Sequence, residues 1–130
     1  MSQQNVDRVQ AAFEHFLRTG EPHWESMHED VELHDHDLID AHEYHGWDGY
    51  ARWFEDWGSA WAEFSLEPEE YLDAGDAVVA VFRLKAVGAG SGVTVERQDA
   101  MVCRMRDTRV GRIDYYNNRE DALRDVGLEK

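Results

Sequence analysis

The chain has 130 residues, 42% of them apolar, which is enough for one hydrophobic core and too apolar for a disordered chain. Its formal net charge of −15 would repel the phosphates of nucleic acids and of anionic membranes, so neither is expected as a partner. No apolar run approaches the ~18 residues of a membrane-spanning helix, and the start lacks the pattern of a signal peptide. A lone cysteine, Cys103, excludes an internal disulfide and is expected in the core. We therefore expect one cytoplasmic domain over residues 1–130.

The first part of the sequence predicts two helices and a strand. Apolar side chains recur every three or four residues within 5–18, which is the period of a helix, and Gly20 ends it. A short second helix is expected around residues 24–27. Residues 31–35 then alternate apolar and polar side chains, as a strand with one buried face does. Asp35 shares a face with the apolar residues of this strand, so the buried side should carry its carboxyl group inward.

A loop then leads into the aromatic-rich segment 47–64. Large aromatic side chains recur there at steps of three and four, with polar residues between them, which predicts an amphipathic helix about 27 Å long. These aromatic residues are Tyr50, Trp53, Phe54, Trp57, Trp61 and Phe64. The helix can be read as a core helix or as one wall of a cavity for a flat, largely apolar ligand. The two interpretations are compatible, because one edge of a core helix can line a cavity.

Four strands and a final helix are predicted beyond this segment. The strands are residues 65–73, 77–87, 94–106 and 109–116, and the turns between them are rich in glycine and aspartate. Pro68 suits an edge strand, because it has no N–H to donate. Asn118 should N-cap the last helix, over residues 119–128. Helices followed by a twisted antiparallel meander predict an α+β fold, with a ligand site at the mouth between helices and sheet.

Three stretches carry a resemblance to a known family: the loop Asp40-Ala41-x-x-Tyr44-x-Gly46, the hairpin GAGSG at 88–92, and YYNNREDALRDVGL at 115–128. With the order of elements, they resemble the nuclear-transport-factor-2-like superfamily, and within it the SnoaL-like, ketosteroid isomerase-like group. The resemblance spans nearly the whole chain. It implies a cone-shaped α+β barrel, in which a strongly curved, mixed or antiparallel sheet packs against three N-terminal helices and a short C-terminal helix follows. It also implies a homodimer across the exposed sheet face.

Ketosteroid isomerases, which this chain resembles in layout, imply two acidic catalytic residues. Their general base falls on Asp35, and their second, protonated aspartate falls on Asp99 or one residue from it. A carboxyl group in an apolar cavity has a raised pKa and can exchange a proton near neutrality, which suits both roles. Their oxyanion-binding tyrosine falls on Phe13, which cannot donate a hydrogen bond, so the same oxyanion hole is not expected. As alternatives, Asp99 could form a buried ion pair with Arg97 or Arg83, and Asp35 could cap the following loop.

A second template, the limonene-epoxide hydrolases, places a catalytic aspartate on Asp114. The arginine of that template falls on Arg83, but its other carboxylate falls on Lys85, and a lysine there argues against epoxide hydrolysis.

Asp114 and Tyr116 share a strand face with Val110 and Arg112, and both are candidate substrate-binding residues. Tyr116 could then supply the hydroxyl group that Phe13 lacks. The alternative is a surface ion pair between Arg112 and Asp114 at the edge of the sheet.

Histidines crowd into residues 28–45, alongside many carboxylates. They are His28, His34, His36, His42 and His45. His34 and His36 would share a strand face and form a candidate pair of ligands for zinc or another divalent ion. However, His34 lies opposite the apolar residues of its strand and therefore on the outer face, so we predict no metal and no other cofactor.

Together, these features predict an apolar, aromatic-lined pocket for a small hydrophobic molecule, polyketide-like or steroid-like. One hypothesis is cofactor-free acid–base catalysis (cyclisation, isomerisation or dehydration), with Asp35 as base and Asp99 stabilising the enolate. The alternative is a non-catalytic ligand-binding or structural protein, in which aromatic side chains fill the cone and carboxylates are ion-paired. The residues expected to bind substrate are Phe13, Trp24, Trp53, Trp57, Trp61, Asp114 and Tyr116.

Overall fold

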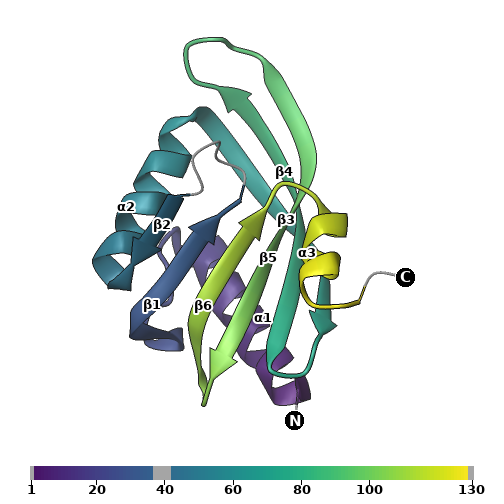
Figure 1. The fold of residues 1–130 in the computed structure, drawn as a ribbon. Coiled ribbons are helices and arrows are strands. Elements are labelled where there is room, and N and C mark those ends of the chain that lie inside the picture. Colours follow the sequence, from purple (N-terminus) through teal and green to yellow (C-terminus); the bar gives the residue numbers. More distant parts are fainter. Residues whose placement is uncertain (1, 37–41, 129–130) are drawn as a thin grey trace.

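The computed structural model describes residues 2–36 and 42–128 and has the predicted α+β fold (Figure 1). In chain order the elements are α1 (Ser2–Thr19), the 3-10 turn η1 (Trp24–Ser26), β1 (Met27–Asp35), β2 (His42–His45), α2 (Gly46–Ser59), β3 (Trp61–Asp73), β4 (Ala77–Gly88), β5 (Thr94–Arg106), β6 (Arg109–Tyr116) and α3 (Arg119–Asp125). The motif residues Asp40 and Ala41 lie outside the described residues.

The six strands form one curved, open sheet in the order β2-β1-β6-β5-β4-β3. Strands β3 to β6 make the predicted antiparallel meander. β1 pairs in parallel with β6, with Leu33 beside Ile113, and β2 pairs antiparallel with β1, so the sheet is mixed. Pro68 lies on β3, which is an edge strand as predicted, and a missing N–H costs least there.

Helices cover both faces of the sheet (Figure 1). We call the face under α1 and α2 the inner face, and the face under α3 the outer face. The inner face buries the larger core, which includes Val31, Leu33 and Phe82. A smaller core on the outer face packs β4 and β5 against Leu123 of α3. The predicted cap begins this last helix, because the side-chain oxygen of Asn118 accepts a hydrogen bond from a backbone N–H three residues on, at 2.8 Å.

The predicted helix over 47–64 is wrong at its C-terminal end. α2 ends at Ser59, and Trp61 begins β3. Gly58 and Ser59 are weak helix formers, and the segment that follows pairs with β4 instead, with Trp61 beside Gly88. The hydrogen bonds of the sheet therefore outweigh the helical spacing of the aromatic side chains, and the last two aromatic residues lie on a strand.

Smaller differences concern the segment before α2. The predicted helix over 24–27 is a single 3-10 turn, and β1 begins already at Met27. β2 lies where a loop was expected, because a strand of four residues is too short to show a clear alternation. Within residues 2–36 and 42–128, no helix combines the length and the apolar character that crossing a membrane requires.

Candidate functional site

Two cavities lie between the helices and the inner face of the sheet, and they share Trp53 and Trp57 as walls. The first has a volume of about 100 Å³ and an almost wholly apolar lining, in which the ring of Phe13 lies 5.3 Å from that of Phe82. The second has a volume of about 280 Å³, close to the ~300–1,000 Å³ of small-molecule sites, and polar groups in its walls. The second cavity therefore combines the larger of the two volumes with polar groups in its wall.

Asp35 forms part of the wall of the second cavity. The alternation along β1 carries it inward together with Val31 and Leu33, and only 3% of its surface is exposed. The indole N–H of Trp53, which is also buried, donates a hydrogen bond to its Oδ2 atom at 2.6 Å. This bond fixes the orientation of the carboxyl group. A buried carboxylate held at the wall of a cavity is well placed to take a proton from a bound molecule.

Asp99 is fully buried on the neighbouring part of the inner face. The guanidinium of Arg97 donates to both of its carboxyl oxygens, at 2.6 and 3.3 Å, and the hydroxyl group of Tyr115 donates to it as well. Burial raises the pKa of Tyr115 well above its ordinary value, and the charge of Asp99 raises it further, so this hydroxyl remains a donor. Asp99 thus acts as an acceptor within the protein, as in the ion-pair alternative that the sequence left open.

The partners of Asp99 reach the cavities although Asp99 itself is not among the described residues that line either one. Tyr115 lines the first cavity and Arg97 lines the second. Tyr115 was not selected by the sequence analysis, which considered its neighbour Tyr116. A strict count of alternation from Ile113, a buried residue of β6, would have found it.

The aromatic residues predicted to bind substrate separate into two groups. Trp53, Trp57, Trp61 and Phe13 line one or both cavities. Trp24 is not among the described lining residues. It packs in η1 against the rings of Trp47 and Tyr50, with centroids 5.9 and 5.8 Å away.

Two of the cavity indoles have unpaired polar groups. Nε1 of Trp57 and Nε1 of Trp61 are buried and have no hydrogen-bond partner among the residues that the structure describes. By contrast, Nε1 of Trp47 donates to a backbone carbonyl, and Nε1 of Trp53 donates to Asp35. Buried N–H groups are nearly always paired in folded proteins, so these two donors require an explanation.

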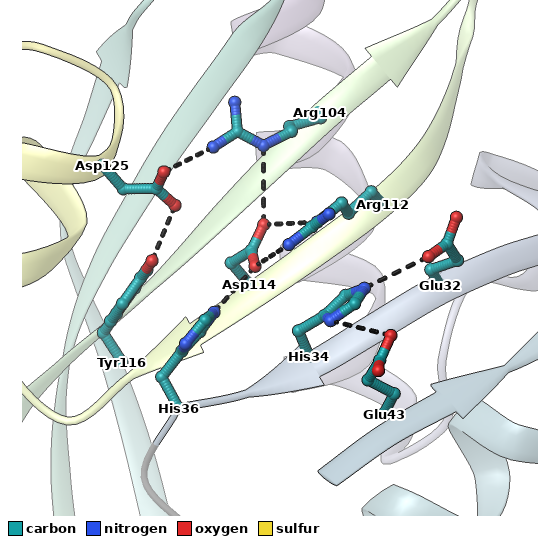
Figure 2. A network of polar contacts seen from close by, with 9 residues as sticks. All are labelled: Glu32, His34, His36, Glu43, Arg104, Arg112, Asp114, Tyr116 and Asp125. Atoms are coloured by element: carbon teal, nitrogen blue, oxygen red, sulfur yellow. Dashed lines mark hydrogen bonds and ion pairs between the residues drawn. The ribbon is translucent and has the colours of Figure 1, made fainter. Parts of the chain in front are cut away.

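Asp114 and Tyr116 lie on the outer face of the sheet, in the polar network that Figure 2 shows, and neither is among the described residues that line a cavity. Asp114 accepts hydrogen bonds from Arg112 at 2.9 and 3.0 Å, and His36 contacts it at 2.8 Å. Tyr116 donates to Asp125 of α3 at 2.7 Å. The prediction that Asp114 and Tyr116 face the substrate cavity is therefore corrected: they belong to a polar network on the other side.

The physical reason for this correction is a bulge in β6. Met105 pairs with Val110 and Arg104 pairs with Arg112, so Gly111 is an extra residue without an opposite partner. The extra residue returns Val110 to the inner face, where it joins the main core, although simple alternation would place it with Asp114. An assignment of faces that starts from Val110 therefore places Asp114 and Tyr116 on the wrong side of the sheet.

The buried carboxyl group of Asp114 lies against the basic side chains of Arg112 and His36. Burial alone would raise the pKa of this carboxyl group, but hydrogen bonds from Arg112 and His36 hold the pKa below its ordinary value. The imidazole of His36 also stacks on the ring of Tyr116, with centroids 4.4 Å apart. The network therefore ties the ends of β1 and β6 to α3, through Asp125.

A separate group of outer-face residues has the chemistry of metal ligands. Glu32, His34 and Glu43 each place one ligand atom within 4.8 Å of the others (Figure 2). However, the imidazole of His34 contacts Glu32 through Nε2, at 3.2 Å, and Glu43 through Nδ1, at 3.4 Å. The two nitrogens of one ring point in different directions, so in this arrangement His34 bridges two carboxylates rather than sharing one ion with them.

Cys103 is buried without a disulfide partner, in the lining of the first cavity. Burial raises the pKa of its thiol to about 12, so it remains uncharged at neutral pH and behaves as the small core residue that the sequence predicted.

The comparisons with known proteins agree with this fold. A family model described as a SnoaL-like domain matches residues 9–113. An NTF2-like protein of unknown function from Burkholderia pseudomallei is 19% identical, with a TM-score of 0.77 over 93% of this chain and 95% of that one. A putative SnoaL-like polyketide cyclase from Jannaschia sp. is 20% identical, with a TM-score of 0.74 over 88% and 85% of the two chains. TerC, co-crystallised with polyporic acid, is 20% identical, with a TM-score of 0.73 over 95% and 97%. No curated protein sequence is significantly similar to this chain.

Proposed function

We propose that this chain, which belongs to the SnoaL-like domain family, binds a small hydrophobic molecule in the second cavity and performs cofactor-free acid–base chemistry on it, with Asp35 as the base. Membership of the family supports a ligand-binding or cyclase-type function. The observation that carries the finer proposal is the buried carboxyl group of Asp35, in a cavity wall that also contains three tryptophans. The substrates would be polyketide-like or steroid-like, and the reaction a cyclisation, isomerisation or dehydration.

These reactions can share one first step. The carboxylate of Asp35 takes a proton from the carbon atom next to a carbonyl group, the electron pair of that C–H bond forms a C=C bond, and the negative charge moves to the carbonyl oxygen. Return of the proton from Asp35 to another carbon of a conjugated enolate completes an isomerisation. In a cyclisation the enolate carbon attacks a second carbonyl group of the same molecule, and the oxygen of that group takes the proton from Asp35. In a dehydration a hydroxyl group on the next carbon leaves with that proton as water. The indole rings of Trp53 and Trp57 would hold the apolar body of the substrate and exclude water from the enolate.

The second candidate is a non-catalytic binding protein. Two observations favour it: Asp99 is engaged by Arg97 and Tyr115, and Phe13 offers no hydroxyl group. Under this candidate, Asp99 is the partner in an ion pair and does not stabilise an enolate. The neighbour TerC, which was co-crystallised with polyporic acid, supports a small molecule as the ligand under either candidate.

One experiment separates the two candidates. The bicyclic ketone 2-tetralone is incubated with the protein in D₂O, binding is measured by calorimetry, and exchange of the protons next to its carbonyl group is followed by NMR. The proposal expects binding and accelerated exchange in the wild type, and binding without acceleration in Asp35→Asn. Asp30→Asn is the matched control, because Asp30 lies on the same strand and is exposed. Binding without acceleration in the wild type would favour the non-catalytic candidate.

We also propose a cytoplasmic homodimer. The support for the dimer is the family resemblance, together with a polar outer face on which His36 and Arg112 are partly exposed, their side chains 39% and 42% accessible. The support for the compartment is a buried cysteine that forms no disulfide. We expect sedimentation equilibrium to give a particle mass twice that of the chain. The mass of a single chain at high protein concentration would contradict the dimer.

A further inference from the structure

We infer that Trp57 and Trp61 bind the oxygen atom of the ligand through their indole N–H groups, and that the ligand is a neutral carbonyl compound. This inference rests on the proposed function of the second cavity and specifies the class of its substrate. The two residues would act as the hydrogen-bond donors for the oxygen on which negative charge develops, in the place of the hydroxyl group that Phe13 lacks.

The first step of the argument is the contrast among the tryptophans of this region. Nε1 of Trp53 donates to Asp35 at 2.6 Å, and Nε1 of Trp47 donates to the carbonyl oxygen of Met27 at 3.3 Å. Nε1 of Trp57 and Nε1 of Trp61 are buried but have no acceptor within the described part of the chain. An indole nitrogen can only donate, so a bound acceptor is what these groups need.

The second step is the position of the two indoles. Trp57 lies in the last turns of α2 and Trp61 is the first residue of β3, so the end of the helix at Ser59 brings them to one cavity from two elements. Their rings are 6.2 Å apart and inclined by 68°. The same cavity contains Asp35, and the oxygen and the acidic proton of a carbonyl compound are separated by only two heavy atoms. The base and the two indoles therefore lie in the wall of one cavity, where one small molecule would contact all three residues.

The third step concerns charge. Asp35 and Asp56 both line the cavity, and their carboxylates would repel a ligand that arrives as an anion. Arg97, a cation among the described residues of the wall, is paired with the buried Asp99. The guanidinium of Arg97 also lies over the ring of Trp61, 5.9 Å from its centre, in a cation–π contact. A neutral ketone, which gains its charge only when the proton leaves, fits these conditions best.

The test compares 2-tetralone with tetralin, which has the same carbon skeleton and no oxygen. In ¹⁵N-labelled protein, each indole N–H gives a separate NMR signal, and Trp57→Phe, Trp61→Phe and Trp47→Phe assign them. We expect 2-tetralone to shift the signals of Trp57 and Trp61 downfield, while tetralin does not. We also expect the ratio of the Kd of tetralin to that of 2-tetralone to fall about tenfold in Trp57→Phe and Trp61→Phe. Trp47→Phe, which changes an indole that is already paired, should keep the ratio.

The outcomes separate this inference from the proposal on which it rests. If both compounds bind and the two indole signals of the wild-type protein do not shift with 2-tetralone, the inference is overturned and the proposed binding function stands. If neither compound binds, the proposed function fails and the inference fails with it. The wild-type spectrum decides between these outcomes even where a variant folds poorly.

Discussion

The hydrogen bond between Trp53 and Asp35 should stabilise the folded protein measurably. Trp53→Phe removes a donor 2.6 Å from a buried carboxylate and leaves a smaller ring in the core. A hydrogen bond to a charged group contributes about 1.5–3 kcal/mol, and the smaller ring costs ~1 kcal/mol more. We therefore expect the free energy of unfolding to fall by about 3 kcal/mol. Far-UV circular dichroism during urea unfolding measures it without depending on the fluorescence of the residue that is removed.

The matched control is Trp24→Phe, which removes an indole that lines neither cavity among the described residues. It should cost about 1 kcal/mol, because only packing changes. A double-mutant cycle of Trp53→Phe with Asp35→Asn should give a coupling free energy of ~1–2 kcal/mol. If Trp53→Phe costs no more than Trp24→Phe, the indole does not orient the carboxyl group of Asp35, and our view of this site would have to be abandoned.

Two further perturbations test other parts of the structure. Asp114→Asn should lower the free energy of unfolding by about 2 kcal/mol at pH 7. This is less than the ~3–5 kcal/mol of a fully buried ion pair, because both Arg112 and Arg104, which also contacts Asp114 at 3.5 Å, are partly exposed. The pKa of Asp114 is lowered in the folded protein, so the stabilisation that its carboxylate provides is complete above the ordinary pKa near ~4 and is lost as the pH falls through the folded-state pKa. The urea midpoints of the wild type and the variant should therefore converge in acid. A constant difference down to low pH would contradict this reasoning. Gly58→Ala should raise the free energy of unfolding by ~0.5–1 kcal/mol, and with it the melting temperature, because the added Cβ meets open space at a helical position. Gly75→Ala meets open space as well but has φ of +82°, so it should lower the melting temperature, and equal effects of the two changes would refute the conformational argument.

The sequence predicts those parts of the fold in which local period and tertiary packing agree. The inward position of Asp35 follows from the alternation of β1, and the strands β4, β5 and β6 lie within a residue of their predicted bounds. Asn118 could be assigned as an N-cap because the side chain of a cap acts within its own helix turn. Each of these signals is local, and nothing at longer range competes with it.

The remaining parts depend on pairings that no local pattern contains. The end of α2 at Ser59 is set by the pairing of β3 with β4, which also places Trp61 beside the second cavity. Tyr115, and not Tyr116, lies on the inner face because β6 contains a single extra residue, Gly111. Such a bulge reverses the face of the residues on one side of it, and a lone glycine within a strand pattern is only a weak signal for its position.

The most direct test of the central claim is the rate at which 2-tetralone exchanges its acidic protons in D₂O with equal concentrations of wild-type protein and Asp35→Asn. General-base catalysis contributes about 10²–10⁴-fold, so we expect the acceleration of the wild type to fall by at least ~100-fold in the variant, while the Kd changes little. Asp30→Asn should exchange at the wild-type rate. An Asp35→Asn protein that binds 2-tetralone and still exchanges its protons as fast as the wild type would show that Asp35 is not the base.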